Sequence, residues 1–339
     1  MSSNSGPPYM PTIAQVGGVP TVSVDVPISA CLIFVYLCLA ATHMTIYQLN
    51  RKREHKFIFS ALLFGFSVAR TAALVMRIAW ATRQTNISIA IAASILTQAG
   101  VIIIFIANLF FAQRIVRAYH ATFGWHMGTR IVFRFLLASV FACLIMVIVC
   151  TVQSFYTLDT GIRSKDRDVQ LVAGTYLAVL AFIPAPAVMI AVLIPSKRHI
   201  EKFGEGRFRT KVRLLVFTSL LLTLGAGFRV GTNFDPRPMS QPAWFHNKAC
   251  YYCFNYAIEI IVSTLYAAVR FDRRFHIPNG AKAAGDYANG AQPRVNTEAE
   301  TFGEDGSTDD DTVIGAAPTE AAWEDRFRKE QNREVGETV

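Results

Sequence analysis

Residues 131–155, IVFRFLLASVFACLIMVIVCTVQSF, decide the fold class of this chain, because they hold a single charged side chain, Arg134. A helix rises about 1.5 Å per residue, so roughly 20 apolar residues cross the ~30 Å hydrocarbon core of a bilayer. A soluble core helix needs only one apolar stripe, whereas this stretch is apolar on every side. We therefore interpret residues 131–155 as a membrane-spanning helix.

Stretches of the same kind occur on both sides of this one. The sixth and seventh spans are interrupted by Arg229 and Glu259, but Leu214–Leu224 and Ile258–Val269 are too apolar to lie outside a membrane. The sequence therefore predicts an all-α bundle of seven transmembrane helices within residues 26–276. Besides residues 131–155, the predicted spans are 26–49, 57–81, 88–112, 171–194, 212–230 and 250–270.

Two local signals refine the helices. Asp25 is expected to cap the first helix, with Pro27 in its first turn, where a missing N–H does no harm. Pro184 and Pro186 are expected to kink the fifth helix, because proline removes a helical hydrogen bond.

The basic residues predict the orientation of the bundle. Eighteen lysine and arginine residues flank the spans on one side and six on the other. Short cytoplasmic loops carry the excess of positive charge, so residues 1–25 are expected to be an extracellular tail. The sequon Asn86-Ile87-Ser88 falls in the first outside loop, which makes Asn86 a candidate glycosylation site.

Composition agrees with a membrane protein and argues against nucleic-acid binding. The chain is 52% hydrophobic and 17% charged, where soluble domains are about a quarter charged. Its positive charge lies in short stretches between apolar runs, which is a membrane-orientation pattern, and no nucleic-acid partner is expected. From Ala281 onward 14 acidic and 6 basic residues accompany few large apolar ones. Residues 277–339 are therefore expected to be a disordered cytoplasmic tail.

Signals of enzyme chemistry are absent from the sequence. There is no His-Glu-x-x-His, Gly-x-Ser-x-Gly or Walker motif, and no pair of aspartates within a span. Five of the six cysteines lie in apolar runs, which indicates buried thiols and not a disulfide framework. His246, Cys250 and Cys253 have zinc-compatible types but lack a second cluster. We expect no enzyme activity, no cofactor and no metal site.

Ionisable side chains inside spans are costly and therefore mark candidate sites. Arg70 lies 13 residues from the inner end of its helix, about 20 Å, and Glu259 lies 11 residues from its inner end, about 17 Å. The two can pair if the second and seventh helices are neighbours. Such a pair would lock two helices, contact a ligand, or act as a switch. Arg77 would face a cavity open to the outside, and Arg229 lies near the outer end of the sixth helix.

Further polar residues extend these candidates. Gln98, Asn108, Asn255 and His43 are expected to form an intramembrane polar network, which interhelical hydrogen bonds alone would explain. The third inside loop either sets the orientation and contacts anionic lipids, or binds an acidic cytoplasmic partner such as a G-protein subunit. Its basic residues are Lys197, Arg198, Lys202, Arg207, Arg209, Lys211 and Arg213.

Several short motifs resemble an uncharacterised seven-helix membrane family of filamentous fungi, over about residues 15–290. They are Gly17-Gly18-Val19-Pro20-Thr21, Asp25-Val26-Pro27, Lys56-Phe57, Asn108-Leu109-Phe110, Lys211, Ala243-Trp244 and Arg270-Phe271-Asp272. The resemblance implies the architecture and no activity. In layout the chain is also similar to fungal lipid-translocating exporters and to fungal receptor-like proteins. It lacks an Asp-Arg-Tyr motif, having Gln113-Arg114-Ile115 at that place.

Three functions remain open from the sequence. The first is a receptor-like sensor in the plasma membrane, with a cavity near Arg77 and Glu259. The second is a transporter of lipids or other amphiphiles, with a polar path through Arg70, Glu259 and Asn108. The third is a structural membrane scaffold without a ligand. Membrane lipids are expected partners in all three.

Overall fold

In the computed structural model, residues 6–55, 57–195 and 200–289 are described, and within them the chain forms helices and no strand. The α-helices are α1 (Val22–Lys52), α2 (Phe59–Thr82), α3 (Ile87–Gly100), α4 (Ile102–Tyr119), α5 (Ala121–Gly124), α6 (Met127–Tyr156), α7 (Thr160–Phe182), α8 (Pro184–Leu193), α9 (Phe208–Phe234), α10 (Lys248–Tyr252), α11 (Ile258–Ala268), α12 (Phe271–Arg274) and α13 (Asp286–Asn289). A 3-10 helix, η1 (Trp244–His246), and a π-helix, η2 (Cys253–Ala257), complete the elements.

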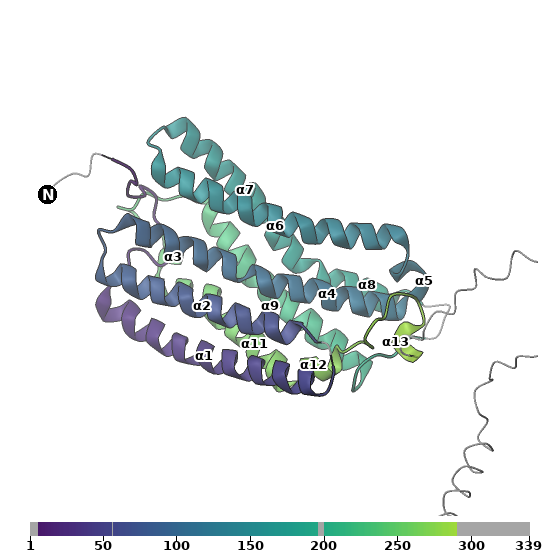
Figure 1. Cartoon of the computed structure of the whole chain (residues 1–339). Coiled ribbons are helices and arrows are strands. Elements are labelled where there is room, and N and C mark those ends of the chain that lie inside the picture. The colour runs from purple at the N-terminus through teal and green to yellow at the C-terminus, as the bar shows by residue number, and fades with distance from the viewer. Residues whose placement is uncertain (1–5, 56, 196–199, 290–339) are drawn as a thin grey trace, which may run out of the picture. The chain divides into compact units, whose positions relative to one another are not determined.

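The long helices lie side by side as a bundle (Figure 1). Helix α1 packs along α2, α2 along α3, and α6 along α7, while α9 contacts α7, α8 and α11. The N-terminal segment and the start of α7 lie at one end of the bundle, and α5, α12 and α13 lie at the other. These are called the outer and inner ends below, after the orientation that the charge pattern predicts.

Six stretches are long and apolar enough to cross a membrane, and each contains one long helix or two consecutive ones. Large apolar side chains point away from the bundle on these stretches. Phe34, Phe135 and Leu193 are 69%, 67% and 74% exposed, which water would disfavour and lipid tails accept. The chain is thus an all-helical, multi-pass membrane protein. The six stretches are Val22–Lys52, Phe59–Thr82, Ile87–Tyr119, Met127–Tyr156, Thr160–Leu193 and Phe208–Phe234.

The predicted seventh span differs in form from the other six. Residues 248–268 are a continuous helical run, but η2 divides it into α10, a π turn and α11. Each α-helical piece is shorter than a membrane-spanning helix. One regular helix over residues 250–270 is therefore not what the chain forms.

Two further helices are interrupted at a single residue. The kink expected from Pro184 is confirmed, since α7 ends at Phe182 and α8 begins at Pro184. The break between α3 and α4 at Val101 was not predicted, because no proline marks it. Helix α1 begins at Val22, so Pro27 lies inside the helix and Asp25 is one turn past the cap position, which Thr21 occupies.

The inner end is closed by a small polar cluster around Asp272. Its carboxylate accepts from Asn50 of α1 at 3.0 Å and from both Nε and Nη2 of Arg270, at 3.1 and 3.0 Å. Burial raises the pKa of Asp272, but the hydrogen bonds from Arg270 and Asn50 and the positive charge of Arg270 lower it, and the net pKa lies below its ordinary value. This cluster ties the start of α12 to the end of α1.

The helical domain extends past the predicted boundary at residue 276. Tyr287 of α13 is buried, with its ring 5.4 Å from Trp125 and 5.5 Å from Phe203. Asn279 also donates to the Glu54 carbonyl at 2.9 Å. Aromatic burial therefore holds residues 277–289 against the inner end, where a disordered tail was expected. The rest of the predicted tail, residues 290–339, lies outside the described residues.

Candidate functional site

A buried ion pair joins α2 to α11 in the middle of the bundle. Arg70 donates through Nε and Nη2 to the two carboxylate oxygens of Glu259, each at 2.5 Å, and both side chains are buried. Two parallel charge-assisted hydrogen bonds fix both distance and orientation. The pairing predicted from equal depth is therefore present.

The break between α3 and α4 makes room for Arg70. Its Nη1 donates to the Thr97 carbonyl at 2.6 Å, the acceptor that a regular helix would offer to the Val101 N–H. A side chain on Gly100 would place its Cβ 3.2 Å from the guanidinium. Glycine thus lets the guanidinium approach the helix backbone, and Arg70 satisfies a carbonyl that the break leaves free.

The π turn η2 precedes Glu259, the other member of the ion pair. It puts Glu259 just after a stretch in which the usual backbone hydrogen bonds are shifted by one residue, a feature frequent at functional sites. Tyr36 of α1 donates to the Tyr256 carbonyl at 3.1 Å, and Asn255 donates to the Tyr251 carbonyl at 3.0 Å. A side chain from α1 and one from the turn itself therefore stabilise the irregular geometry.

A second arginine shares the same carboxylate. Arg229 of α9 lies 3.5 Å from Oε1 of Glu259 and 3.4 Å from Oδ1 of Asn255, and its side chain is 20% exposed. Both carboxylate oxygens are already engaged by Arg70 at shorter distance. Two guanidinium groups thus face one carboxylate, which leaves one positive charge without a full partner.

Arg77 belongs to a separate network at the outer end. It donates to Oδ1 of Asp25 through Nε and Nη2, at 3.2 and 3.1 Å, and to the Gly17 carbonyl at 2.8 Å. Lys248 and Tyr252 also bond to the Asp25 carboxylate, at 2.5 and 2.8 Å. Asp25 was predicted only as a helix cap. The sequence signal for its pairing was its place at the outer end of the first predicted span, level with Arg77 and Lys248 at the outer ends of the second and seventh.

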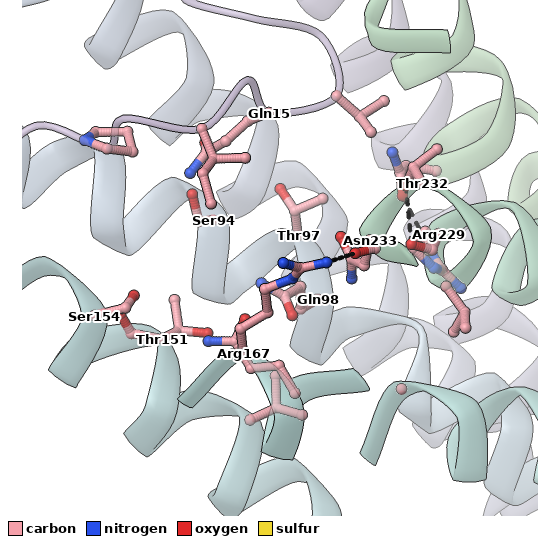
Figure 2. Close-up of a pocket in the computed structure, with 18 of the residues that line it drawn as sticks. Gln15, Ser94, Thr97, Gln98, Thr151, Ser154, Arg167, Arg229, Thr232 and Asn233 are labelled. Atoms are coloured by element: carbon pink, nitrogen blue, oxygen red, sulfur yellow. Dashed lines mark hydrogen bonds between the residues drawn. The ribbon is translucent and has the colours of Figure 1, made fainter. Parts of the chain in front are cut away.

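A cavity of about 380 Å³ lies between these two networks, surrounded by α2, α3, α4, α6, α7, α9 and the start of the run 248–268. In Figure 2 the Arg167 side chain extends across it toward Asn233. Its Nη2 lies 3.5 Å from the Asn233 carbonyl. Arg229 and Thr232 lie on the α9 side in the same view, and Gln98 is drawn next to the outer part of the Arg167 side chain.

The charged part of the cavity lining is positive. Four arginines contribute to it, Arg77, Arg163, Arg167 and Arg229, and no carboxylate among the described residues does. The buried Nε of Arg167 and Nε1 of Trp80 have no acceptor within the described part of the chain. Buried polar groups normally find a partner, so these donors indicate a place for an acceptor.

The N-terminal segment covers the outer side of the cavity. Tyr9 donates to the Phe155 carbonyl at 2.7 Å, Ala14 to the Arg237 carbonyl at 2.8 Å, and Gly17 to the His246 carbonyl at 2.9 Å. Residues 11–16 line the cavity directly. Gly17 has φ +84°, and a Cβ there would meet the Tyr251 ring at 2.7 Å, so only glycine fits. An extended segment that was predicted as a tail is thus part of the site.

The other predicted polar residues belong to the cavity lining or to separate hydrogen-bond networks. Gln98 and Asn255 line the cavity. Asn108 lies in a different network, where it donates to Ser219 at 3.2 Å and accepts from Tyr266. His43 bonds to Ser263 at 3.0 Å. The predicted single polar network is therefore several networks, because the side chains leave their helices in different directions.

Asn86 caps α3, and its side-chain oxygen accepts from the Ile89 N–H at 3.3 Å. The residue is exposed, and it stands directly at the first turn of the helix.

Only some of the basic side chains in the predicted third inside loop are exposed. Lys202, Arg207, Arg209 and Arg213 are exposed, whereas Lys211 is buried, donates to the Phe203 carbonyl and lies 4.7 Å from the Phe203 ring centre. Lys211 is therefore a core residue and not part of a docking face. Lys197 and Arg198 lie outside the described residues.

All six cysteines are free. In the described ranges no group of three or more His, Cys, Asp or Glu side chains is placed to hold a metal ion. His246 instead accepts the Ala243 N–H through Nδ1 at 3.1 Å.

Comparison with known proteins gives one match. Residues 207–276 are similar to a family described as "Protein of unknown function (DUF3112)". This segment covers α9, the run 248–268 and α12, and so contains both Arg229 and Glu259. No curated protein and no solved structure matches the chain. What the comparison establishes is a similarity of the C-terminal third of the helical domain to that family.

Proposed function

We propose that the protein is a receptor-like membrane sensor that binds an anionic amphiphile in the outer cavity. In this proposal the run 248–268 crosses the membrane as a seventh span, the N-terminus lies outside, and the protein works at the plasma membrane. The observation that carries the proposal is the shared carboxylate: within the described part of the chain, Arg70 and Arg229 both pair with Glu259 and with no other carboxylate.

Charge balance supports an anionic ligand. An incompletely paired guanidinium in a low-dielectric interior is expensive, and a ligand carboxylate or phosphate beside Arg229 would compensate it. The donors of Arg167 and Trp80 would supply further hydrogen bonds. Hydrogen bonds to a charged group contribute about 1.5–3 kcal/mol each, so losing one weakens binding about tenfold or more.

The floor of the cavity supports an apolar body on the ligand. Phe105 of α4, Leu144 of α6 and Leu177 of α7 contribute apolar side chains to its lining. A volume of about 380 Å³ is within the range of small-molecule sites, about 300–1,000 Å³. A medium-chain carboxylate would satisfy both the basic and the apolar walls.

Packing below the ion pair favours sensing over transport. Phe111 stacks on Phe275 with ring centres 4.5 Å apart and meets Tyr266 at 5.8 Å, while Phe57 meets Phe271 at 5.2 Å. These buried rings pack between α4, α11 and α12 on the inner side of Asn108, where a transport path through Asn108 would have to pass. A ligand at the outer cavity would instead act on α9 and α11 through Arg229 and Glu259. Exposed Lys202, Arg207, Arg209 and Arg213 would then be available to an acidic partner such as a G-protein subunit.

The test uses the full chain in phosphatidylcholine nanodiscs, with decanoate as the probe and decanol as its neutral counterpart. We expect decanoate, but not decanol, to raise the melting temperature and to be retained in native mass spectrometry. Arg229→Gln and Arg167→Gln should weaken decanoate binding about tenfold or more. Arg83→Gln is the matched control, because Arg83 is an exposed outer-end arginine outside the cavity. Equal binding of decanol, or equal loss in the Arg83 variant, would contradict the proposal.

A flux measurement distinguishes a sensor from a transporter. Proteoliposomes that bind decanoate but do not accelerate its equilibration beyond empty liposomes would agree with a sensor. Accelerated equilibration that Arg229→Gln abolishes would establish the transporter instead.

A further inference from the structure

A second cavity, of about 500 Å³, lies at the inner end between α4, α6 and the segment after α12. It shares no lining residue with the outer cavity. Helix α6 packs mainly along α7, and α4 packs along α8 and α2, so the seam between α4 and α6 is left with open volume. In Figure 1 this seam runs toward the end where α5 and α13 lie.

The two helices present matching amphipathic faces to this cavity. On α4 the lining positions Leu109, Gln113 and Arg117 follow one another at intervals of four, and on α6 Arg130 and Arg134 do the same. Residues four apart share a helix face. Arg117 is about 12 Å along the axis from Leu109. The basic side chains are therefore at the inner end of the seam and the apolar ones are deeper in the bilayer.

The basic end of the cavity has four cations and no lining carboxylate among the described residues. They are Arg117, Arg130, Arg134 and Lys282. Two acids of the inner end accept backbone N–H groups: Glu201 accepts from the Gly285 N–H at 2.8 Å, and Asp286 accepts from the Lys282 N–H at 2.7 Å. The structure gives the side chains of Arg130 and Arg134 no ion pair within its described part. Among the described residues, the charged side chains that line the cavity are therefore all positive.

Arg117 is held in place at the mouth of the cavity. Its guanidinium carbon lies 4.4 Å above the Trp125 ring, and its Nε lies 3.4 Å from the Gly124 carbonyl. A Cβ on Gly124 would come within 2.6 Å of the Arg117 backbone, so glycine is needed for the loop to approach α4. The buried Nε1 of Trp125 has no acceptor among the described residues. A pre-positioned cation and an unused N–H donor both indicate an anionic, oxygen-rich group.

The surroundings of the cavity are suited to acyl chains. Leu109, Phe110, Phe133 and Leu137 line its deeper part. Ile131 and Phe135 on the same helix are 54% and 67% exposed, so a lipid-facing surface directly adjoins the basic residues. Basic pockets between transmembrane helices on the cytoplasmic side hold anionic phospholipid headgroups.

We infer that the α4–α6 cavity at the inner end is a binding site for a phosphorylated anionic phospholipid, with its headgroup on Arg117, Arg130 and Arg134 and an acyl chain along Leu109 and Leu137. This site is independent of the ligand proposed for the outer cavity. It is specific for lipid and not for soluble phosphate, because its apolar half would remain unfilled by an ion.

The test places the full chain in nanodiscs of phosphatidylcholine with a small fraction of phosphatidylinositol phosphate and counts retained lipids by native mass spectrometry. Each basic residue near a membrane surface contributes about 1 kcal/mol to binding an anionic lipid. The double variant Arg130→Gln/Arg134→Gln should therefore retain the lipid about ten- to thirtyfold less. The matched control is Arg51→Gln/Arg53→Gln, which removes two exposed arginines from the same end of the bundle, outside the cavity.

Retention lost in the cavity variant and kept in the control would support the site. Equal loss in both would show general surface electrostatics and overturn it. Equally tight binding of the water-soluble headgroup alone would also overturn it, since the apolar half would then contribute nothing. Arg134→Gln alone, at an exposed position, guards against a folding defect and should still reduce retention severalfold. Melting temperatures in pure phosphatidylcholine should be unchanged in all variants.

Discussion

Replacing Glu259 with glutamine should destabilise the bundle strongly, and neutralising Arg229 should partly reverse the loss. Glutamine keeps the shape of the side chain but removes the charge that Arg70 contacts at 2.5 Å and Arg229 at 3.5 Å. Removing one partner of a buried ion pair costs about 3–5 kcal/mol, because the other charge is left buried alone. Here two guanidinium groups are left, and they repel each other.

The contacts of Glu259 predict a different change in the free energy of unfolding for each variant. Arg229→Gln alone should cost less than about 1 kcal/mol, since Glu259 keeps its two short bonds to Arg70. The double variant Glu259→Gln/Arg229→Gln should be more stable than Glu259→Gln, by the 0.5–3 kcal/mol coupling typical of residues in contact, or about 1 kcal/mol. The control pair Glu259→Gln/Arg83→Gln, with a distant exposed arginine, should show no recovery.

The assay is thermal unfolding in nanodiscs. For chains of 150–250 residues, 1 kcal/mol corresponds to about 2–4 °C, so Glu259→Gln should melt about 6–20 °C lower than the original protein. If that variant does not accumulate, recovery is scored as folded protein on size-exclusion chromatography. A double variant that is no better than Glu259→Gln would refute the idea that Arg229 and Arg70 compete for one carboxylate. So would an Arg229→Gln loss as large as that of Glu259→Gln.

Three more outcomes follow from particular contacts. Asp25→Asn should cost about 3–5 kcal/mol, because it leaves the buried Arg77 and the partly buried Lys248 without their carboxylate. Asp235→Asn, in a half-exposed pair, should cost less than about 1 kcal/mol in the same melting assay. Gly100→Ala should lower the free energy of unfolding by about 1–3 kcal/mol, because the new methyl group meets the guanidinium of Arg70. The control Gly65→Ala, with open space around it, should be neutral or stabilising by up to about 1 kcal/mol, and equal melting points would contradict this packing. Asp272 has a lowered pKa, so its contribution to stability is complete above the ordinary aspartate pKa and is lost as pH falls through the lower, folded-state pKa. Asp272→Asn should therefore flatten the decline of the melting temperature below about pH 4, and an unchanged decline would refute this role.

Much of the fold could be predicted from local sequence. The lengths of the apolar runs predicted the six long spans to within a few residues at most ends, because crossing a bilayer depends on local length and composition. The proline break at Pro184 followed from the chemistry of a single residue. The start of α7 at Thr160 was missed because its first turns are polar and extend beyond the predicted span.

The candidate site was predictable only in part. Arg70 and Glu259 were identified as a pair because depth along a helix follows from residue number. The partner of Arg77 was not, since Asp25 was interpreted as a cap. The division of Asn108 and Asn255 between separate networks depends on side-chain direction, which residue types do not specify when the neighbouring helix is unknown.

The sequence by itself determined that this chain is a helical membrane protein with charged side chains held inside its spans. Hydrophobic length and charge are properties of single segments, so they can be evaluated without knowing which helices meet. Only the tertiary structure decided that Arg229 shares Glu259 with Arg70, that residues 11–16 cover a cavity, and that the α4–α6 seam is open at its basic end. Each of these results from helix faces brought together by packing, where the side chains of several distant segments must fit the same space at once.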